Sequence, residues 1–325
     1  MTTTRRALLV APLALPAIAA RAQDAAWPTR PLTMLVPFVA GGPSDIVARL
    51  IAARLGPLLG QPVVAENRTG ANGAIAAQAL ARAAPDGHTL LTGSIGVFSI
   101  NPALRPNLAY DPVRDFAPLT LAVTTPNVLV VNPASVPVSD FAGFVAWLKA
   151  NPTRGAYSTS GVGSSEHLTM ELLKLRTGTE AQHVPYQGGA AAATAVLAGD
   201  VPFTIQNLGT VAQQIAGGTL RPLMMTGGSR APTIPQVPTA AECGLADFVV
   251  TSWQAVMTQA AVPAPVLARL EAGCIEALRH PESVARLGQI GLTVVAGSAA
   301  ELRAFQIAEI ARWREVVRVA NIRAE

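Results

Sequence analysis

LTMLVPFVAGGPSDIVARLIAARLG, residues 32–56, is the stretch that decides the fold. It begins with a short apolar run typical of a buried strand and continues through a loop of turn-forming residues at 38–45. Apolar residues then recur at helical spacing, so a strand leads through a glycine turn into a helix. We expect Ser44 or Asp45 to cap that helix with a side-chain oxygen.

A helix that begins directly after a strand exposes backbone N–H groups and the positive end of its dipole. These groups form a seat for an anion. The same turn also occurs in α/β proteins that bind nothing there, so the rest of the chain must decide between the two interpretations.

The composition predicts a globular protein of about two domains, since 50% of the 325 residues are hydrophobic. The formal net charge is +4, but Arg5, Arg6 and Arg21 lie within the first 22 residues. The rest of the chain has 21 basic and 20 acidic residues, a net charge near +1. There is no basic block, and only 5% of the residues are aromatic. We therefore predict no binding to nucleic acid.

Residues 1–22 have the features of a secretory signal peptide. Arg5 and Arg6 precede an uncharged run, and a small-x-small site follows at 20–22. The run is shorter than the roughly 20 residues of a membrane span. The arginine pair also resembles a twin-arginine signal. We expect an exported mature protein that is not embedded in the membrane.

Two cysteines, Cys243 and Cys274, could be bridged in an oxidising compartment. Cys274 lies on an apolar helical face, which favours a buried free thiol. Neither has a neighbouring histidine, so we predict no metal site.

Strands alternate with helices along the mature chain, which predicts mainly parallel sheets flanked by helices. Loops at the carboxyl ends of such strands open at one edge, where ligands bind. We interpret the extended segments at 118–132 and 249–257 as two crossings between domains. Domain 1 would comprise 27–125 and 252–325, and domain 2 residues 126–251. Such a pair can close around a cleft by hinge motion.

Three loops in the second half of the chain share the features of the loop at 38–45. Each follows a strand and offers backbone N–H groups and short polar side chains; the loops lie at 160–165, 186–189 and 207–209. Such groups suit a carboxylate that is held and released, whereas a catalytic site would show a poised base. The pattern predicts binding without catalysis and without a cofactor. The alternative is an exported hydrolase or isomerase that uses Ser164 or Ser165 with His167.

The motif VPF at 36–38, followed by two glycines at 41–42 and by Asp45, resembles the VPF-PPGG-D signature of the tripartite tricarboxylate transporter substrate-binding receptors, the Bug family. Further motifs match in order: VAENR at 64–68, AAPDG at 83–87, NPAL at 101–104, YDP at 110–112, DFAP at 115–118, GVGSS at 161–165, HVPY at 183–186, PQVPT at 235–239, TSW at 251–253 and EIARW at 309–313. The resemblance covers essentially the whole mature chain.

This resemblance implies a monomeric, two-domain periplasmic binding protein of the α/β class. It would capture a small organic acid or an amino acid and deliver it to membrane subunits of a tripartite tricarboxylate-type transporter. Loops 38–45 and 160–165 would be the two jaws that hold a carboxylate, partly through ordered water. The expected ligand-binding residues are Phe38, Ala40, Gly41, Gly42, Ser44, Asp45, Ser94, Ser160, Gly161, Ser164, Ser165, Tyr186, Gln187, Gly188 and Asn207.

Three departures from the family pattern leave the ligand open. The first loop has lost two prolines and gained Pro43, which has no N–H to offer. Glu166 stands where the first of two histidines is usual and adds negative charge near the second jaw. Gln206 replaces a carboxylate. For Asp45 we favour a helix cap over contact with an anion, and a contact would favour an ammonium group.

Overall fold

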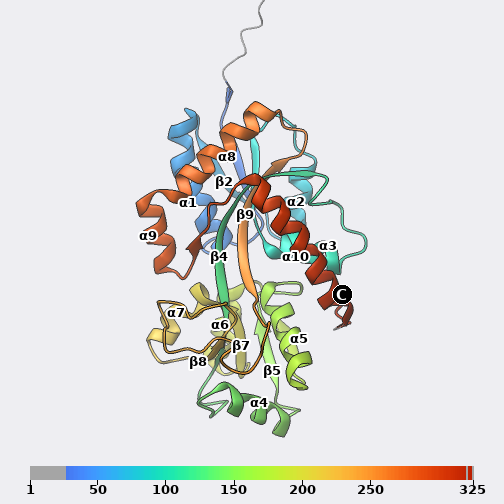
Figure 1. Ribbon diagram of the computed structural model, residues 1–325, viewed down its shortest axis with the longest axis vertical. Helices are drawn as coiled ribbons and strands as arrows, with labels where there is room; N and C mark the ends of the chain where they lie inside the picture. Colours follow the sequence, from blue (N-terminus) through green and yellow to red (C-terminus); the bar gives the residue numbers. More distant parts are fainter. Residues whose placement is uncertain (1–26, 320, 324–325) are drawn as a thin grey trace, which may run out of the picture.

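The computed structural model describes residues 27–319 and 321–323, which form two lobes stacked along the long axis (Figure 1). The predicted signal peptide, residues 1–22, lies outside the described residues. Strands β4 (Phe116–Val131) and β9 (Thr251–Gln259) lie side by side where the lobes join (Figure 1).

The first lobe is built from both ends of the chain. Besides β9 it contains β1 (Leu32–Val36), α1 (Pro43–Leu59), β2 (Val63–Asn67), the 3-10 turn η1 (Ala71–Gly73), α2 (Ala74–Ala81), β3 (Thr89–Ser94), the π-helix η2 (Gly96–Ile100), α3 (Asn101–Leu104), α8 (Ala264–Arg279), α9 (Pro281–Gln289), β10 (Thr293–Val294) and α10 (Ala299–Val319).

The second lobe comes from the middle of the chain. It contains α4 (Phe141–Ala150), β5 (Ala156–Thr159), α5 (Ser165–Thr177), β6 (Gln182–Pro185), α6 (Gly189–Ala198), β7 (Phe203–Asn207), α7 (Leu208–Ala216) and β8 (Arg221–Met225).

The strands follow the order β2-β1-β3-β9-β4-β7-β5-β6, with β8 and β10 also paired to β4. In the first lobe β1 is parallel to β2 and β3, and in the second β5 is parallel to β6 and β7. Strand β9 is antiparallel to β3 and β4, and β4 is antiparallel to β7. The predicted α/β class is confirmed, with parallel strands in each lobe and antiparallel strands where the chain crosses.

Strand β4 passes through Pro126 without ending. It pairs with β9 from Phe116 to Pro126 and with β7 from Asn127 to Val131. Proline is tolerated because the strand exchanges one partner for the next at this point, where the ladder is interrupted in any case.

Two short helical turns, η2 and α3, were not predicted. They lie where the chain leaves β3, and their position is fixed by packing: Phe98 is buried, stacks on Trp253 at 6.2 Å and meets the edge of Phe116. Contacts between residues so far apart in the sequence produce no hydrophobic periodicity within the segment, so the local pattern could not predict these turns.

Helices cover both faces of the sheet in each lobe. In the first lobe α1, α8 and α9 lie on one side and α2, α3 and α10 on the other (Figure 1). Each side has its own apolar core, and the core under α2 and α10 continues into the second lobe beneath α4 and α5. A further core lies under α6 and α7.

Helix α10 is tied to β9 through Glu309. The buried carboxylate accepts hydrogen bonds from the indole nitrogens of Trp253 on β9, at 3.2 Å, and of Trp313 on its own helix, at 3.0 Å. Both indole rings are fully buried. This joint anchors the C-terminal helix to the strand that returns from the second lobe.

Cys243 and Cys274 are both free thiols, and Cys274 is buried as the apolar pattern indicated. Among the helices of the described chain, none combines the length and the apolar character needed to cross a bilayer.

Candidate functional site

We call residues 38–45 the first-lobe loop and residues 160–165 the second-lobe loop. The first-lobe loop joins β1 to α1, and the second joins β5 to α5. The remaining predicted residues lie at the end of β3, in the turn between β6 and α6, and at the end of β7.

Asp45 holds the first-lobe loop in shape. Its buried carboxylate accepts hydrogen bonds from Arg49 Nε and the Gly41 N–H, both at 3.0 Å, and from Asn67 Nδ2 at 2.9 Å. Asn67 also donates to the carbonyl of Phe38. Burial raises the pKa of Asp45, but the hydrogen bonds from Arg49, Gly41 and Asn67 outweigh it and leave the pKa below its ordinary value. The charge of Asp45 is therefore neutralised within the protein.

The expected cap of α1 by Ser44 or Asp45 is wrong. The helix begins at Pro43 with Gly42 as its N-cap, and no side chain caps it. Proline suits this first helical position, since no N–H is needed there. Ser44 Oγ instead donates to Gln254 Oε1 on β9 at 2.5 Å.

Backbone donors remain unused at the start of α1. The first helical hydrogen bond runs from the Ile46 N–H to the Gly42 carbonyl, at 3.0 Å. The N–H groups of Ser44 and Asp45 precede it and have no acceptor among the described residues. With the charge of Asp45 neutralised, this helix end is suited to an anion.

Several backbone donors of the second-lobe loop are, by contrast, used within the protein. Ser164 Oγ caps α5 by accepting from the His167 N–H at 3.2 Å. The Gly163 N–H donates to His167 Nδ1, and the Gly161 N–H to Thr159 Oγ1, both at 3.2 Å. The structure thus assigns to the protein itself donors that the sequence analysis offered to a ligand.

The geometry does not support the alternative of serine catalysis. The ring of His167 stacks on His183 with 4.0 Å between centroids, and its Nδ1 already accepts from a backbone N–H. Burial lowers the pKa of His167 to about 4 and that of His183 to about 3. In the described chain neither Ser164 nor Ser165 donates its hydroxyl to an imidazole, as a nucleophile and its base require.

The carboxylate of Glu166 lies at the amino end of α5. Ser165 Oγ donates to Glu166 Oε2 at 3.2 Å, and the Glu166 N–H and the hydroxyls of Ser160 and Ser164 also face the carboxylate. Only 5% of the residue is exposed. Burial raises the pKa of Glu166, and these donors oppose the shift in part.

The predicted residues of the second lobe lie together. Gly161, at φ +129°, has the carbonyl of Tyr186 3.6 Å from the place a Cβ would take. Asn207 Nδ2 donates to Asn127 Oδ1 at 2.5 Å and to Ser165 Oγ at 3.4 Å. The second-lobe loop therefore touches both the turn before α6 and the end of β7.

The loops of the two lobes also meet. Asn72 Nδ2, in the first lobe, donates to the carbonyl of Gly163 in the second-lobe loop at 2.8 Å. A Cβ on Gly188, at φ +110°, would lie 3.8 Å from Val39 Cγ2 of the first-lobe loop. Each of the two loops thus lies close to a segment of the opposite lobe.

Three residues of this region were absent from the predicted set: Asn67, Asn72 and Gln254. Asn67 ends β2 at the sheet edge that the first-lobe loop occupies, so the strand-end rule could have found it. Asn72 lies between Gly70 and Gly73 at φ +51°, and asparagine tolerates this left-handed conformation. Gln254 carries no local signal, because it meets Ser44 across 210 residues of sequence.

Ser94 ends β3 half-buried and is paired in register with Gln254. Ala40 and Gln187 are exposed, and the Gln187 side chain makes no hydrogen bond to any described residue. These three predicted residues are placed beside the site without a contact that assigns them a role.

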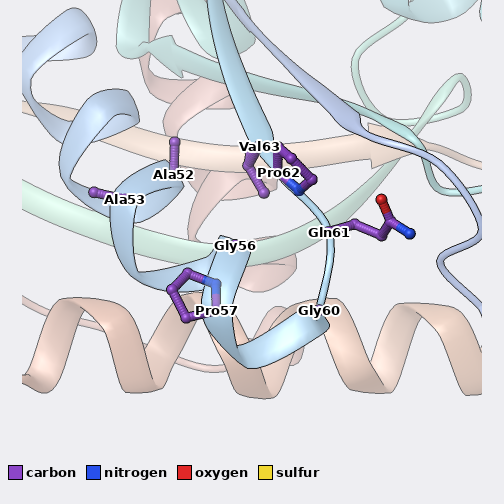
Figure 2. Close-up of a pocket in the computed structure, with 8 residues that line it drawn as sticks. All are labelled: Ala52, Ala53, Gly56, Pro57, Gly60, Gln61, Pro62 and Val63. Carbon is purple, nitrogen blue, oxygen red and sulfur yellow. The ribbon is translucent and has the colours of Figure 1, made fainter.

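A hollow of about 440 Å³ lies elsewhere, between the end of α1 and the start of β2 (Figure 2). It is lined by alanine, glycine, proline and valine with Gln61 as its one polar side chain. Such a lining offers nothing to hold a charged ligand, so we assign it no function. Within the described residues, no three His, Cys, Asp or Glu side chains are grouped so as to bind a metal.

The model of the tripartite tricarboxylate transporter family receptors matches residues 47–322 of the sequence. The chain belongs to this family. The receptor is 36% identical over 302 residues to the protein BugT of Bordetella pertussis (strain Tohama I), a match that covers 93% of this chain and 92% of BugT.

Two solved structures are closely similar to the receptor. Rpa4515 of R. palustris with adipate has a TM-score of 0.86 at 36% identity and covers 91% of this chain and 99% of that one. The periplasmic binding protein BugD has a TM-score of 0.85 at 32% identity, covering 92% and 100%. The resemblance inferred from the motifs and the two-domain periplasmic binding protein fold are both confirmed.

Proposed function

We propose that the receptor binds a small carboxylate between its first-lobe and second-lobe loops and passes it, chemically unchanged, to the membrane subunits of a tripartite tricarboxylate-type transporter. One observation carries this proposal: the start of α1 keeps free backbone N–H groups while the only nearby carboxylate of the first-lobe loop, that of Asp45, is neutralised by Arg49.

Three further points support a binding role. Rpa4515 is a relative solved with adipate, a dicarboxylate. The free donors of α1 lie in the loop that approaches Gly188 of the other lobe. The arrangement of Ser164 and His167 lacks the hydrogen bond that nucleophilic catalysis uses. The ligand would therefore be held, and no bond in it would be broken.

The domains of this proposal divide at 125–126 and 251–252. These positions lie next to the change of partner of β4 between Pro126 and Asn127 and next to the start of β9 at Thr251. Closure would turn one lobe against the other about these two strands. The mature protein would act as a monomer in the periplasm, exported by a cleaved signal peptide.

A thermal-shift screen of small organic acids and amino acids tests the proposal. We expect saturable stabilisation by at least one carboxylate, and recovery of that compound unchanged after incubation, read by NMR. Conversion of the compound by the wild-type protein, lost in Ser164→Ala, would overturn the receptor role in favour of an enzyme.

A further inference from the structure

Three carboxylates are buried in the described chain, and they differ in how their charge is compensated. Asp45 pairs with Arg49 at 2.9 Å, and Glu309 pairs with Arg312 at 3.4 Å. Glu166 forms no ion pair with any described residue and faces only hydroxyls and its own N–H. A buried carboxylate without a cation is unfavourable as a charge, and it is relieved either by taking up a proton or by pairing with a cation from outside the protein.

The position of Glu166 changes what the second-lobe loop can accept. Its carboxylate occupies the amino end of α5, where an anionic ligand would otherwise bind. A ligand carboxylate brought there would meet a like charge. The two loops therefore differ in the groups they present. The first-lobe loop has free N–H donors at the start of α1, and the second-lobe loop has a carboxylate acceptor at the start of α5.

A second acceptor without a partner lies in the same lobe. Gln206 is fully buried, and its Nε2 donates to Thr204 Oγ1 at 3.1 Å. Its Oε1 has no hydrogen-bond partner among the described residues. This oxygen lies 2.8 Å from the position of a Cβ on Gly189, the first residue of α6 after the Tyr186 turn. A second buried acceptor beside the Tyr186 turn is therefore left unsatisfied by the described residues.

We propose that Glu166 is a specificity-determining residue, which selects ligands that carry an ammonium group beside their carboxylate. The carboxylate would bind the N–H groups at the start of α1, and the ammonium group would face Glu166 and supply its missing cation. This inference rests on the proposed function, because it names the ligand class of the same site.

Matched pairs of acids test it by isothermal titration at pH 7: aspartate with malate, alanine with lactate, and 4-aminobutanoate with glutarate. In each pair an amino group replaces a hydroxyl or a carboxylate. We expect the wild-type receptor to bind at least one amino compound tenfold or more tightly than its partner, which is about 1.4 kcal/mol. Glu166→Gln should remove that preference. Glu180→Gln is the matched control, since the Glu180 side chain is 86% exposed in the same lobe, and it should leave the preference unchanged.

The outcomes separate the two proposals. If, in every pair that binds, the wild-type receptor binds malate, lactate or glutarate at least as tightly as the amino partner, the role of Glu166 is refuted while the receptor function stands. If no acid of the panel or of the wider screen binds, both are refuted. The absence of a preference in the wild-type protein refutes the role of Glu166 even where Glu166→Gln does not fold.

Discussion

The side-chain amide of Asn72 donates a hydrogen bond to the carbonyl of Gly163 at 2.8 Å and so joins the loops of the two lobes. The bond exists only while the lobes are close, so it contributes to the equilibrium between open and closed forms.

Asn72→Gly should therefore favour the open form. Glycine keeps the left-handed backbone without strain and removes the donor. One hydrogen bond contributes about 1 kcal/mol, so we expect roughly fivefold weaker ligand binding by titration and a larger radius of gyration by X-ray scattering. Ala71→Gly is the control, since Ala71 shares the left-handed conformation, at φ +48°, and should change neither quantity. Unaltered affinity and size in Asn72→Gly would mean that this bond does not bias closure.

Gly42→Val should weaken binding without destabilising the fold. Gly42 has an ordinary extended backbone, at φ −80° and ψ 171°, and an added Cβ would meet only the Val39 carbonyl, at 3.8 Å. The side chain would instead cover the free donors at the start of α1. We expect affinity to fall tenfold or more while the melting temperature moves by less than about 2 °C.

Gly228→Val serves as its control, because nothing lies within 4 Å of a Cβ at Gly228. It should leave both affinity and melting temperature unchanged. Full affinity in Gly42→Val would place the ligand away from this loop.

Asp45→Asn should destabilise the receptor in a pH-dependent way. The folded pKa of Asp45 lies below the unfolded value of 3.8, so its stabilising contribution is present above pH 3.8 and is lost as the pH falls through the folded pKa. Replacing a charged acceptor should cost about 2 kcal/mol at pH 7, or about 4 °C in melting temperature, with a shrinking difference in acid. Asp200→Asn, at an exposed position, should show no such trend. A difference that stays constant with pH would assign the effect to packing alone.

Glu309→Leu should be strongly destabilising, because it leaves the buried indole N–H groups of Trp253 and Trp313 without an acceptor. Each unsatisfied donor costs roughly 1–3 kcal/mol, so denaturant unfolding should show a loss of about 3 kcal/mol. Glu315→Leu on the same helix removes only an exposed ion pair with Arg318 and should leave stability nearly unchanged. Equal effects of the two variants would show that the indole bonds contribute little.

Much of the fold followed from local pattern. The strand, glycine turn and helix of residues 32–56 appear as predicted, as do the parallel strands of each lobe, because hydrophobic periodicity and turn residues act over a few positions. The π-helix η2 at Gly96–Ile100 was not predicted, because the packing of Phe98 against the ring of Trp253, distant in the sequence, determines its position.

The site was predicted unevenly for the same reason. The strand-end rule identifies which segments follow the strands, but the partner of each polar group is not a local property. Thus Ser44 was expected to cap α1 and instead bonds Gln254 of β9.

By itself, the sequence determined the family, the α/β class and the loops that follow the strands, since these depend on residue types at short spacings. Only the tertiary structure decided that Asp45 is neutralised, that Glu166 lies uncompensated at the amino end of α5, and that Asn72 reaches Gly163. Burial and charge pairing are set by neighbours that the folded chain brings together from distant positions, and no local pattern records them.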